Sequence, residues 1–460
     1  MKKDFILIVN FIFLTISIIG CLPNREPTAP TEIQRPQALY IEPEEGKLIV
    51  PITTSILMYF SEPMDPSTFN GRFKLYDIDS NFIEGNFIQK DSIIQFIPKT
   101  TLKKSTIYYG ELRGRVRDLN RNSITKDNNP VWDDTTLLLK NWFYTEGNYS
   151  DGGFYDVYLR DKKDGKIISF KRVDSTFYLV ENLSAPDGFN VSSDGKYLVI
   201  ANTTKNQVQV VSTNNGNILA NFDVAQNPIT VKTFNNYAYI LSVNGRAITK
   251  INLLTLQIEK VINLNFYPGK LEVSRDQTKL YTLDQSTRDL VIINSENGTI
   301  IKRVRSAVTN LVVGEIKFNS AKDKLYVCDS KGRKVKIYDE NGNFINDFAV
   351  FDVGIEPIDL YFLNNKIHIV AGNSIFFFDE ETGNREYLLS YSIPVKSTCI
   401  IPSGDLMYVV LTSSVQILDY RTKFLLKTIN LNSSGITEGQ VGQVVGSVLN
   451  GALSPFTTSG

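Results

Sequence analysis

The sequence predicts an all-β protein with an N-terminal β-sandwich and a seven-bladed β-propeller that a C-terminal strand closes. Three observations predict this fold class. Phe (27) and Tyr (22) are plentiful, which is typical of strands. Residues 153 to about 430 repeat with a period near 40 residues, whereas residues 38–146 contain short alternating strands without that repeat. A chain of 460 residues is long enough for two or three domains.

The N-terminus has the features of a targeting segment. Lys2 and Lys3 precede an apolar run that is too short to span a membrane comfortably and that ends at Cys21. The letters IIGC at its end resemble the cleavage site of bacterial lipoproteins. That resemblance implies a signal peptide over residues 1–20 and a lipid on Cys21, and Leu22 after the cysteine implies the outer membrane. The alternative is an uncleaved anchor with an incidental cysteine.

Residues 21–37 then combine the lipidated cysteine with a Pro-rich tether. We expect an extracytoplasmic protein, lipid-anchored to the cell envelope at the outer membrane or cell surface. Lys+Arg and Asp+Glu both number 49, so the net charge is zero. A nucleic-acid partner would favour a basic protein, and we expect none.

Residues 38–146 contain six or seven short strands, which predicts an antiparallel sandwich. Three stretches in this segment resemble the SbsA-type bacterial Ig-like domain: YFSEPMDPSTF (59–69), IIQFIPKTTLKKSTIYYGEL (93–112) and VRDLNRNSI (116–124). The resemblance implies a spacer or binding module without catalysis. Of Tyr108 and Tyr109, one is expected to pack inward because neighbouring strand residues face opposite sides.

A weak metal candidate lies in the same domain. Asp118 and Asn120 begin a run like the first half of an EF-hand loop, and Asp127 is nearby. The run has Ser123 where that loop needs glycine and Asn129 where it needs glutamate. A solvated loop rich in Asp and Asn is therefore favoured over a calcium site.

The repeat appears when apolar runs that end in a polar turn are aligned. One column, 40 to 45 residues apart, contains Tyr158, Val199, Tyr239, Tyr281, Tyr326, His368 and Tyr408. Seven copies of a four-strand unit at this period predict a propeller over residues 147–450. The units VIAN, YTLD and YVCD resemble the YVTN β-propeller repeats. The first unit lacks one strand, so part of residues 440–449 is expected to complete it, and residues 451–460 to form a flexible tail.

The stretch LYVCDSKGRKVKIYDENGN (325–343) tests whether the repeat hides a reactive site. Cys328 falls in an apolar column, which predicts a core residue, and Asp329 is placed to cap the next turn. Lys334 and Lys336 alternate with apolar residues, which predicts a solvated strand face. The stretch therefore reads as one blade.

The chemistry available for catalysis is sparse. His368, the one histidine, lies inside a predicted strand, and Cys399 lies in an apolar run. A disulfide or a thiolate nucleophile is the alternative to two buried cysteines. We predict no catalytic residues and no cofactor, and the ligand-binding residues stay unknown.

The function expected from these features is a non-catalytic, membrane-anchored envelope lipoprotein. Its propeller would serve as a scaffold that binds a protein or a glycan. The alternatives are a propeller enzyme of lactonase or lyase type that uses loop carboxylates, and an envelope-assembly factor.

Overall fold

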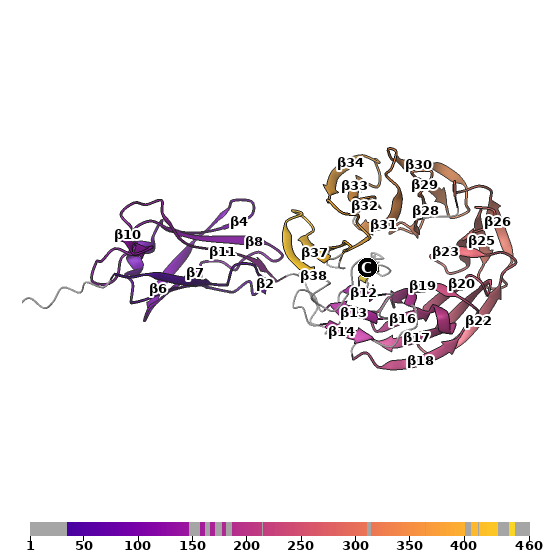
Figure 1. The fold of residues 1–460 in the computed structure, drawn as a ribbon, viewed down its shortest axis with the longest axis horizontal. Helices are drawn as coiled ribbons and strands as arrows, with labels where there is room; N and C mark the ends of the chain where they lie inside the picture. The colour runs from indigo at the N-terminus through magenta and orange to yellow at the C-terminus, as the bar shows by residue number, and fades with distance from the viewer. Residues whose placement is uncertain are drawn as a thin grey trace, which may run out of the picture. The chain divides into compact units, whose positions relative to one another are not determined.

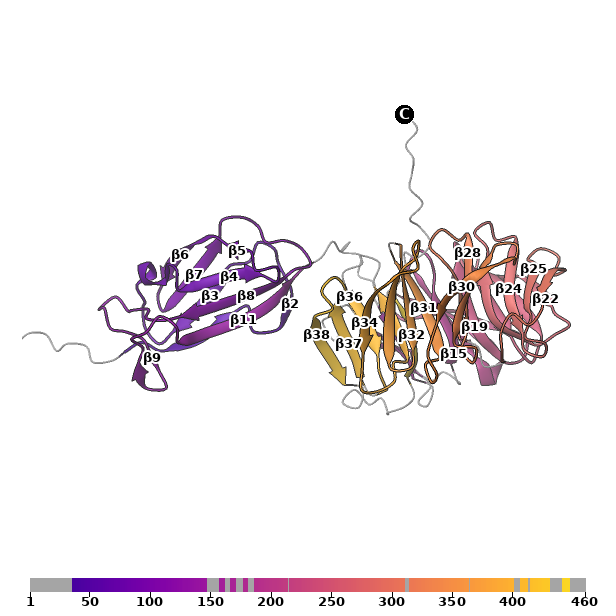
Figure 2. The ribbon, with the colours of Figure 1, turned by 90° about the horizontal axis from the view of Figure 1, so that it is seen from above.

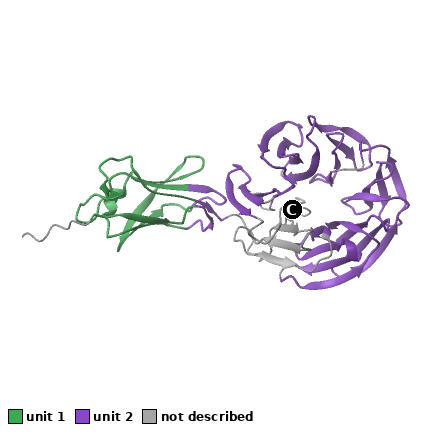
Figure 3. Cartoon of the chain, in the orientation of Figure 1, with its two compact units in different colours: residues 1–45, 54–101, 109–142 green, residues 46–53, 102–108, 143–460 purple. Residues whose placement is uncertain are grey.

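The structure is a computed structural model that describes residues 35–146, 157–161, 166–170, 177–180, 186–213, 215–310, 314–363, 365–400, 406–412, 414–430 and 441–446. The expected signal peptide, Cys21 and the expected tail lie outside these residues. The chain divides into two compact units (Figure 3). The first is Met1–Glu45, Thr54–Thr101 and Tyr109–Trp142, and the second is Gly46–Thr53, Leu102–Tyr108 and Phe143–Gly460.

Two β-sheets form the N-terminal fold (Figure 1). One has the order β1-β3-β7-β6, with β1 (Ala38–Glu42), β3 (Ile56–Phe60), β7 (Ile93–Pro98) and β6 (Gly85–Lys90). The other has the order β2-β11-β8-β4-β5, with β2 (Lys47–Val50), β11 (Leu137–Thr145), β8 (Ile107–Arg113), β4 (Phe73–Asp77) and β5 (Phe82–Ile83). A short hairpin of β9 (Thr125–Lys126) and β10 (Asn129–Pro130) and the 3₁₀ turn η2 (Pro66–Phe69) complete it.

The core of this fold follows from alternation along the strands. Ile56, Met58 and Phe60 of β3 are buried, and the residues between them are partly exposed. Tyr108 is fully buried, whereas Tyr109 is not, which confirms the expectation that one of the two packs inward. The sequence predicts an antiparallel sandwich, and this prediction was wrong in one respect. Strand β11 pairs with β2 in parallel.

Among the described residues from 157 onward, seven four-stranded antiparallel sheets are arranged about a common axis (Figure 1). In order along the chain from the second sheet, they are β15 (Pro186–Val191), β16 (Tyr197–Asn202), β17 (Gln207–Ser212), β18 (Ile218–Asp223); β19 (Pro228–Phe234), β20 (Tyr237–Ser242), β21 (Ala247–Asn252), β22 (Gln257–Asn263); β23 (Pro268–Val273), β24 (Lys279–Asp284), β25 (Leu290–Asn294), β26 (Ile300–Val304); β27 (Ile316–Phe318), β28 (Lys324–Asp329), β29 (Lys334–Asp339), β30 (Phe344–Val350); β31 (Pro357–Leu363), β32 (Lys366–Ala371), β33 (Ser374–Asp379), β34 (Arg385–Ser390); and β35 (Ser397–Ile400), β36 (Leu406–Val410), β37 (Ser414–Asp419), β38 (Leu425–Asn430). The 3₁₀ turn η3 (Thr203–Lys205) follows β16.

The first sheet combines strands from both ends of the unit. It has the order β14-β13-β12-β39, with β14 (Phe177–Val180), β13 (Lys166–Phe170), β12 (Val157–Asp161) and β39 (Val441–Gly446). Strand β39 pairs with β12, and it also contacts β15 of the second sheet and β35 of the seventh. The C-terminal strand therefore occupies the place of the missing first strand.

In the second to seventh sheets the second strand is buried on both faces, because it packs between neighbouring sheets. Tyr239, Tyr281, Tyr326 and Tyr408 of the predicted column are fully buried. The apolar side chains of one sheet pack against those of the next, as where Cys328 meets Ile369 and Phe376 in one core cluster. In the view turned by 90°, the strands run across the thickness of the ring (Figure 2).

The stretch at residues 325–343 forms β28, a turn and β29, as predicted for one repeat. Cys328 is buried, and Asp329 accepts hydrogen bonds from the backbone N–H groups of Thr309 and Gly332 at 2.9 and 3.1 Å. The prediction for Lys336 was wrong. Its ammonium group is 2.9 Å from Asp329 Oδ2 with only 17% of its side chain exposed, because that face of β29 packs on the segment entering β27.

No helix long and apolar enough to cross a membrane occurs among the residues that the structure describes.

Candidate functional site

The weak metal candidates Asp118 and Asn120 lie in the loop before β9, and Asp127 lies in the turn after it. Asp118 is buried, and its two carboxylate oxygens accept hydrogen bonds from the backbone and side-chain N–H groups of Asn122, at 2.6 and 2.8 Å. Asp127 has a left-handed backbone and lies in the turn between β9 and β10. Within the described part of the chain, no group of three or more His, Cys, Asp or Glu is arranged to hold a metal ion. Asp118 differs from the expected solvated loop residue, because it is buried and bonded within its own turn.

Cys328 and Cys399 are both free thiols and both buried. Burial raises the pKa of the Cys328 thiol well above its usual value, so it stays protonated and a poor nucleophile. His368 is fully buried, and its Nε2 lies 2.9 Å from the hydroxyl of Tyr420. Burial, with a smaller effect of the Lys423 charge, lowers the pKa of His368 to about 3, so the ring is neutral at physiological pH.

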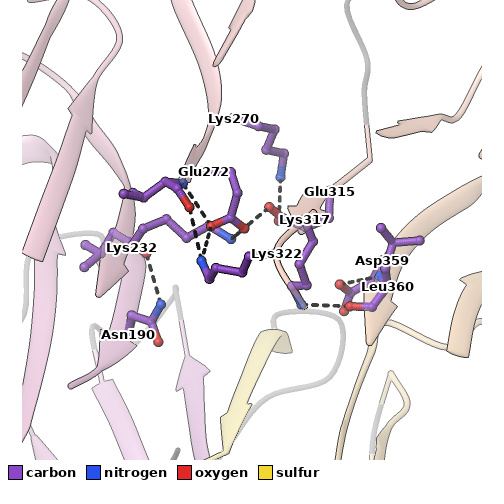
Figure 4. Close-up of polar contacts among 11 residues, drawn as sticks. Asn190, Lys232, Lys270, Glu272, Glu315, Lys317, Lys322, Asp359 and Leu360 are labelled. Atoms are coloured by element: carbon purple, nitrogen blue, oxygen red, sulfur yellow. Dashed lines mark hydrogen bonds and ion pairs between the residues drawn. The ribbon is translucent and has the colours of Figure 1, made fainter. Parts of the chain in front are cut away.

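A cluster of charged residues lies on the inner strands, the strands nearest the axis in Figure 1. Apolar residues of these strands point into the cores between sheets, for example Leu271 and Val273 of β23. Lys270 and Glu272 occupy the alternate positions of β23, so these charged side chains face away from those cores. Figure 4 shows them together. We name the following residues the inner-strand charge cluster: Lys232 from β19, Lys270 and Glu272 from β23, Glu315 just before β27, and Lys322 from the turn after β27.

Lys232 is the centre of this cluster. Its ammonium nitrogen is 3.4 Å from Glu272 Oε2 and also 3.4 Å from Glu315 Oε1, so it contacts carboxylates from the next two sheets. Lys270 is 3.5 Å from Glu315 Oε2, and Lys322 is 3.8 Å from Glu272 Oε1. Lys322 also donates to the backbone carbonyl of Val273 at 3.1 Å and lies over the ring of Phe234. Three lysines thus surround two carboxylates.

The electrostatics favour the charged forms of Lys232, Glu272 and Glu315. Burial opposes ionisation of Glu315, but the charges of Lys270 and Lys232 outweigh it and lower its pKa to about 2. Burial likewise opposes ionisation of Glu272, yet Lys232 and Lys322 lower its pKa. The two glutamates raise the pKa of Lys232 against the effect of burial. Paired charges of this kind are costly to break, because removing one partner leaves the other buried and uncompensated.

Beyond this cluster, polar contacts continue from the fifth sheet to the seventh. Lys317 of β27 donates to the backbone carbonyl of Leu360 in β31 at 2.7 Å (Figure 4). Ser397 of β35 donates to Asp359 Oδ2 of β31 at 2.7 Å. Each contact joins the inner strand of one sheet to that of the next, so these side chains hold neighbouring sheets together.

The cluster does not have the properties of an acid–base pair. Such a pair needs one carboxyl whose pKa is raised so that it can donate a proton. Here both Glu272 and Glu315 have lowered pKa values. This cluster was not predicted from the sequence. The signal was present as charges that alternate with apolar residues in VKTF, KLEV and EIKF, the strands preceding the tyrosine column.

Comparison with known families supports the division of the chain. The model of the bacterial Ig-like domain matches residues 32–136. A second model, of the strictosidine synthase family, matches residues 147–214. None of the curated proteins compared with the chain matches it. The N-terminal part is therefore an Ig-like domain.

Solved structures show the fold of the remainder. A functionally unknown protein from Desulfotomaculum acetoxidans aligns with a TM-score of 0.55 at 9% identity, covering 64% of this chain and 98% of that chain. A protein from Bacteroides uniformis, provisionally assigned as a 6-phosphogluconolactonase, aligns with a TM-score of 0.51 at 13% identity over 64% of this chain and 99% of that chain. The second part has the propeller fold.

Proposed function

We propose that the chain is a non-catalytic binding scaffold of the cell envelope. In this proposal, the seven sheets form a closed seven-bladed propeller of the YVTN type, and the Ig-like domain is a spacer of the SbsA type. Cys21 carries the lipid anchor, at the outer membrane or cell surface. Support for ring closure comes from β39, which pairs with β12 and contacts strands of the second and seventh sheets.

The observation that carries the proposal is the inner-strand charge cluster. Glu272 and Glu315 are each within 3.8 Å of two lysine ammonium groups. Both carboxylates therefore form ion pairs that hold neighbouring sheets together. The buried thiols and the neutral His368 add no accessible nucleophile or base. A rigid ring whose loops vary freely suits recognition.

The competing function is a lactonase or lyase that uses carboxylates. The test is to incubate the purified full chain with sugar lactones and acidic glycans, following proton release and the absorbance of unsaturated uronate products. We expect no turnover above the buffer blank, either from the native chain or from a Glu272→Gln/Glu315→Gln variant. Turnover by the native chain that this variant loses, while it still folds, would overturn the proposal.

An envelope-assembly factor is distinguished by its partner. Crosslinking intact cells and purifying the chain from membranes would then recover one protein in stoichiometric amount. Recovery of one such stoichiometric protein would favour the assembly role over glycan binding or catalysis.

A further inference from the structure

One turn position recurs on the same side of three neighbouring sheets. Arg246, Arg288 and Arg333 close the turns between the second and third strands of the third, fourth and fifth sheets. All three have left-handed backbones, with φ of 46°, 66° and 56°. Each backbone carbonyl accepts a hydrogen bond from the segment after the fourth strand, from Leu264, Val308 and Phe351 respectively. We name these three residues the arginine arc.

The hydrogen bond from the segment after the fourth strand accounts for the left-handed backbone at this position. It does not account for the choice of arginine there. The same position is Asn206 in the second sheet, with φ 55°, and Gly372 in the sixth, with φ 63°. Their carbonyls accept equivalent bonds, from Val224 and Val395. Glycine and asparagine are the ordinary residues for this conformation, whereas other side chains cost about 1 kcal/mol or more there. Three successive arginines therefore bear a backbone cost that the turn itself does not require.

Hydrogen bonds connect the three turns into one surface. Arg246 Nη2 donates to the Tyr267 hydroxyl at 2.6 Å, and the Tyr267 carbonyl accepts from the backbone N–H of Gln285 in the next turn at 2.9 Å. Arg288 Nη1 donates to the carbonyl of Thr309 at 3.0 Å, and Thr309 in turn bonds Asp329, at the start of the Arg333 turn. The arginines thus lie on adjacent turns.

Their charges are not neutralised by the protein. Across the residues described by the structure, no carboxylate lies within ion-pair distance of the arginine arc. Other cations nearby are paired: Arg303 with Asp284 at 2.8 Å, Lys336 with Asp329 at 2.9 Å, and Lys331 with Glu356 at 2.6 Å. Arg246 and Arg288 are exposed, and Arg333 is half-buried. Guanidinium groups with free donors are suited to bidentate bonds with oxyanions.

We propose that the arginine arc binds an acidic polysaccharide through uronate carboxylates, one per arginine. The cations are spread singly over three sheets, with the acidic Glu356 and Asp352 on the neighbouring connection. A DNA duplex, with one charge per about 1.7 Å, favours a continuous basic surface instead. Phosphate groups favour several donors gathered at one point. Tyr267, 39% exposed, holds the Arg246 guanidinium, whose central carbon lies 4.1 Å from the centroid of the tyrosine ring.

This inference rests on the proposed binding function and names its ligand class. The experiment measures binding of the purified full chain to immobilised polygalacturonate, with neutral dextran and single-stranded DNA as comparison ligands. The test variant is Arg246→Asn/Arg288→Asn/Arg333→Asn, because asparagine suits the left-handed turn. The matched control is Lys74→Asn/Lys90→Asn/Lys140→Asn, which removes the same charge from the N-terminal domain.

We expect salt-sensitive binding to polygalacturonate that the arc variant weakens about tenfold or more and the control variant leaves within about twofold. The melting temperature of the arc variant should not fall. A lower melting temperature with unchanged affinity would show that the arginines only fasten turns. Equal or tighter binding to DNA, or no binding to polygalacturonate, would also overturn the inference. In that case, a protein partner recovered by crosslinking would still support a binding function for the chain. Catalytic turnover would instead overturn both the inference and the proposed function.

Discussion

The ammonium nitrogen of Lys232 lies 3.4 Å from Oε2 of Glu272, so one ion pair joins the inner strands of the third and fourth sheets. The same nitrogen is 3.4 Å from Oε1 of Glu315, which belongs to the fifth sheet. One lysine therefore connects three sheets, and its loss should be felt as loss of stability.

We expect Lys232→Met to destabilise the protein by at most about 3–5 kcal/mol, because two buried carboxylates lose their shared cation and each keeps one other lysine. Urea unfolding monitored by fluorescence measures this change. The control is Lys260→Met, which breaks the exposed pair with Glu296, whose carboxylate side chain is 84% exposed. That control should leave the free energy of unfolding nearly unchanged, because solvent screens the exposed pair. Equal stability of the two variants would contradict the structural role of the cluster.

The repeat was predictable because each sheet needs the same buried residue in its second strand. Spacing alone located Tyr239, Tyr281 and Tyr326, and all three are buried. The pairing of Lys232 with Glu272 and Glu315 was not predictable in this way. It depends on how adjacent sheets face each other around the axis, and residue spacing within one repeat does not contain that distance.

Lys336 is a second residue whose surroundings could not be predicted from the sequence. Alternation correctly placed it opposite Val335, but alternation cannot distinguish a face covered by water from one covered by a connecting segment. Its contact with the carbonyl of Ala307, at 2.8 Å, comes from the chain that enters the fifth sheet. The arginine arc was also missed, because a left-handed backbone at an arginine leaves no mark in the sequence pattern.

Stability should depend on pH in the acidic range. In the folded protein the neighbouring lysines lower the pKa of Glu315 to about 2, whereas the unfolded chain has the ordinary value of 4.5. As pH falls, the unfolded chain binds this proton first. The stabilisation is therefore complete above about pH 5 and is lost as the pH falls toward 2, by at most about 3 kcal/mol.

Melting curves of the native chain and of Glu315→Gln between pH 6 and pH 3 check this, in buffers of about 0.1 M ionic strength. The difference in melting temperature between the two proteins should shrink as the pH falls. A difference that stays constant or grows would contradict the ionised state of Glu315.

Removing one buried hydroxyl should stabilise the protein. Thr282 in β24 is fully buried, and its Oγ1 has no hydrogen-bond partner among the described residues. We expect Thr282→Val to raise the free energy of unfolding by about 1 kcal/mol, because the methyl group packs where the hydroxyl is unsatisfied. Chemical denaturation measures it.

The matched comparison is Thr309→Val, at a threonine whose Oγ1 donates to Asp329 Oδ2 at 2.7 Å. That change should destabilise the protein, because a buried carboxylate loses a donor. If both substitutions changed the free energy of unfolding in the same direction, the claim that Thr282 Oγ1 is unsatisfied would be contradicted.

Replacement of the expected lipid-bearing residue tests localisation. Cys21→Ala should leave the protein unprocessed or soluble, because the thiol that would receive the lipid is absent. Membrane fractionation and metabolic labelling with a fatty-acid analogue check this. A variant that remains acylated and membrane-bound would show that the anchor lies elsewhere.

The most direct test of the account is removal of residues 431–460, which include β39. In the proposed closed ring, β39 supplies the strand beside β12. Calorimetry of the truncated chain should then show a lower melting temperature for the propeller and a less cooperative transition, with the Ig-like domain unaffected. A truncated protein whose propeller melts at the same temperature and in the same single transition as the full chain would contradict the closed ring.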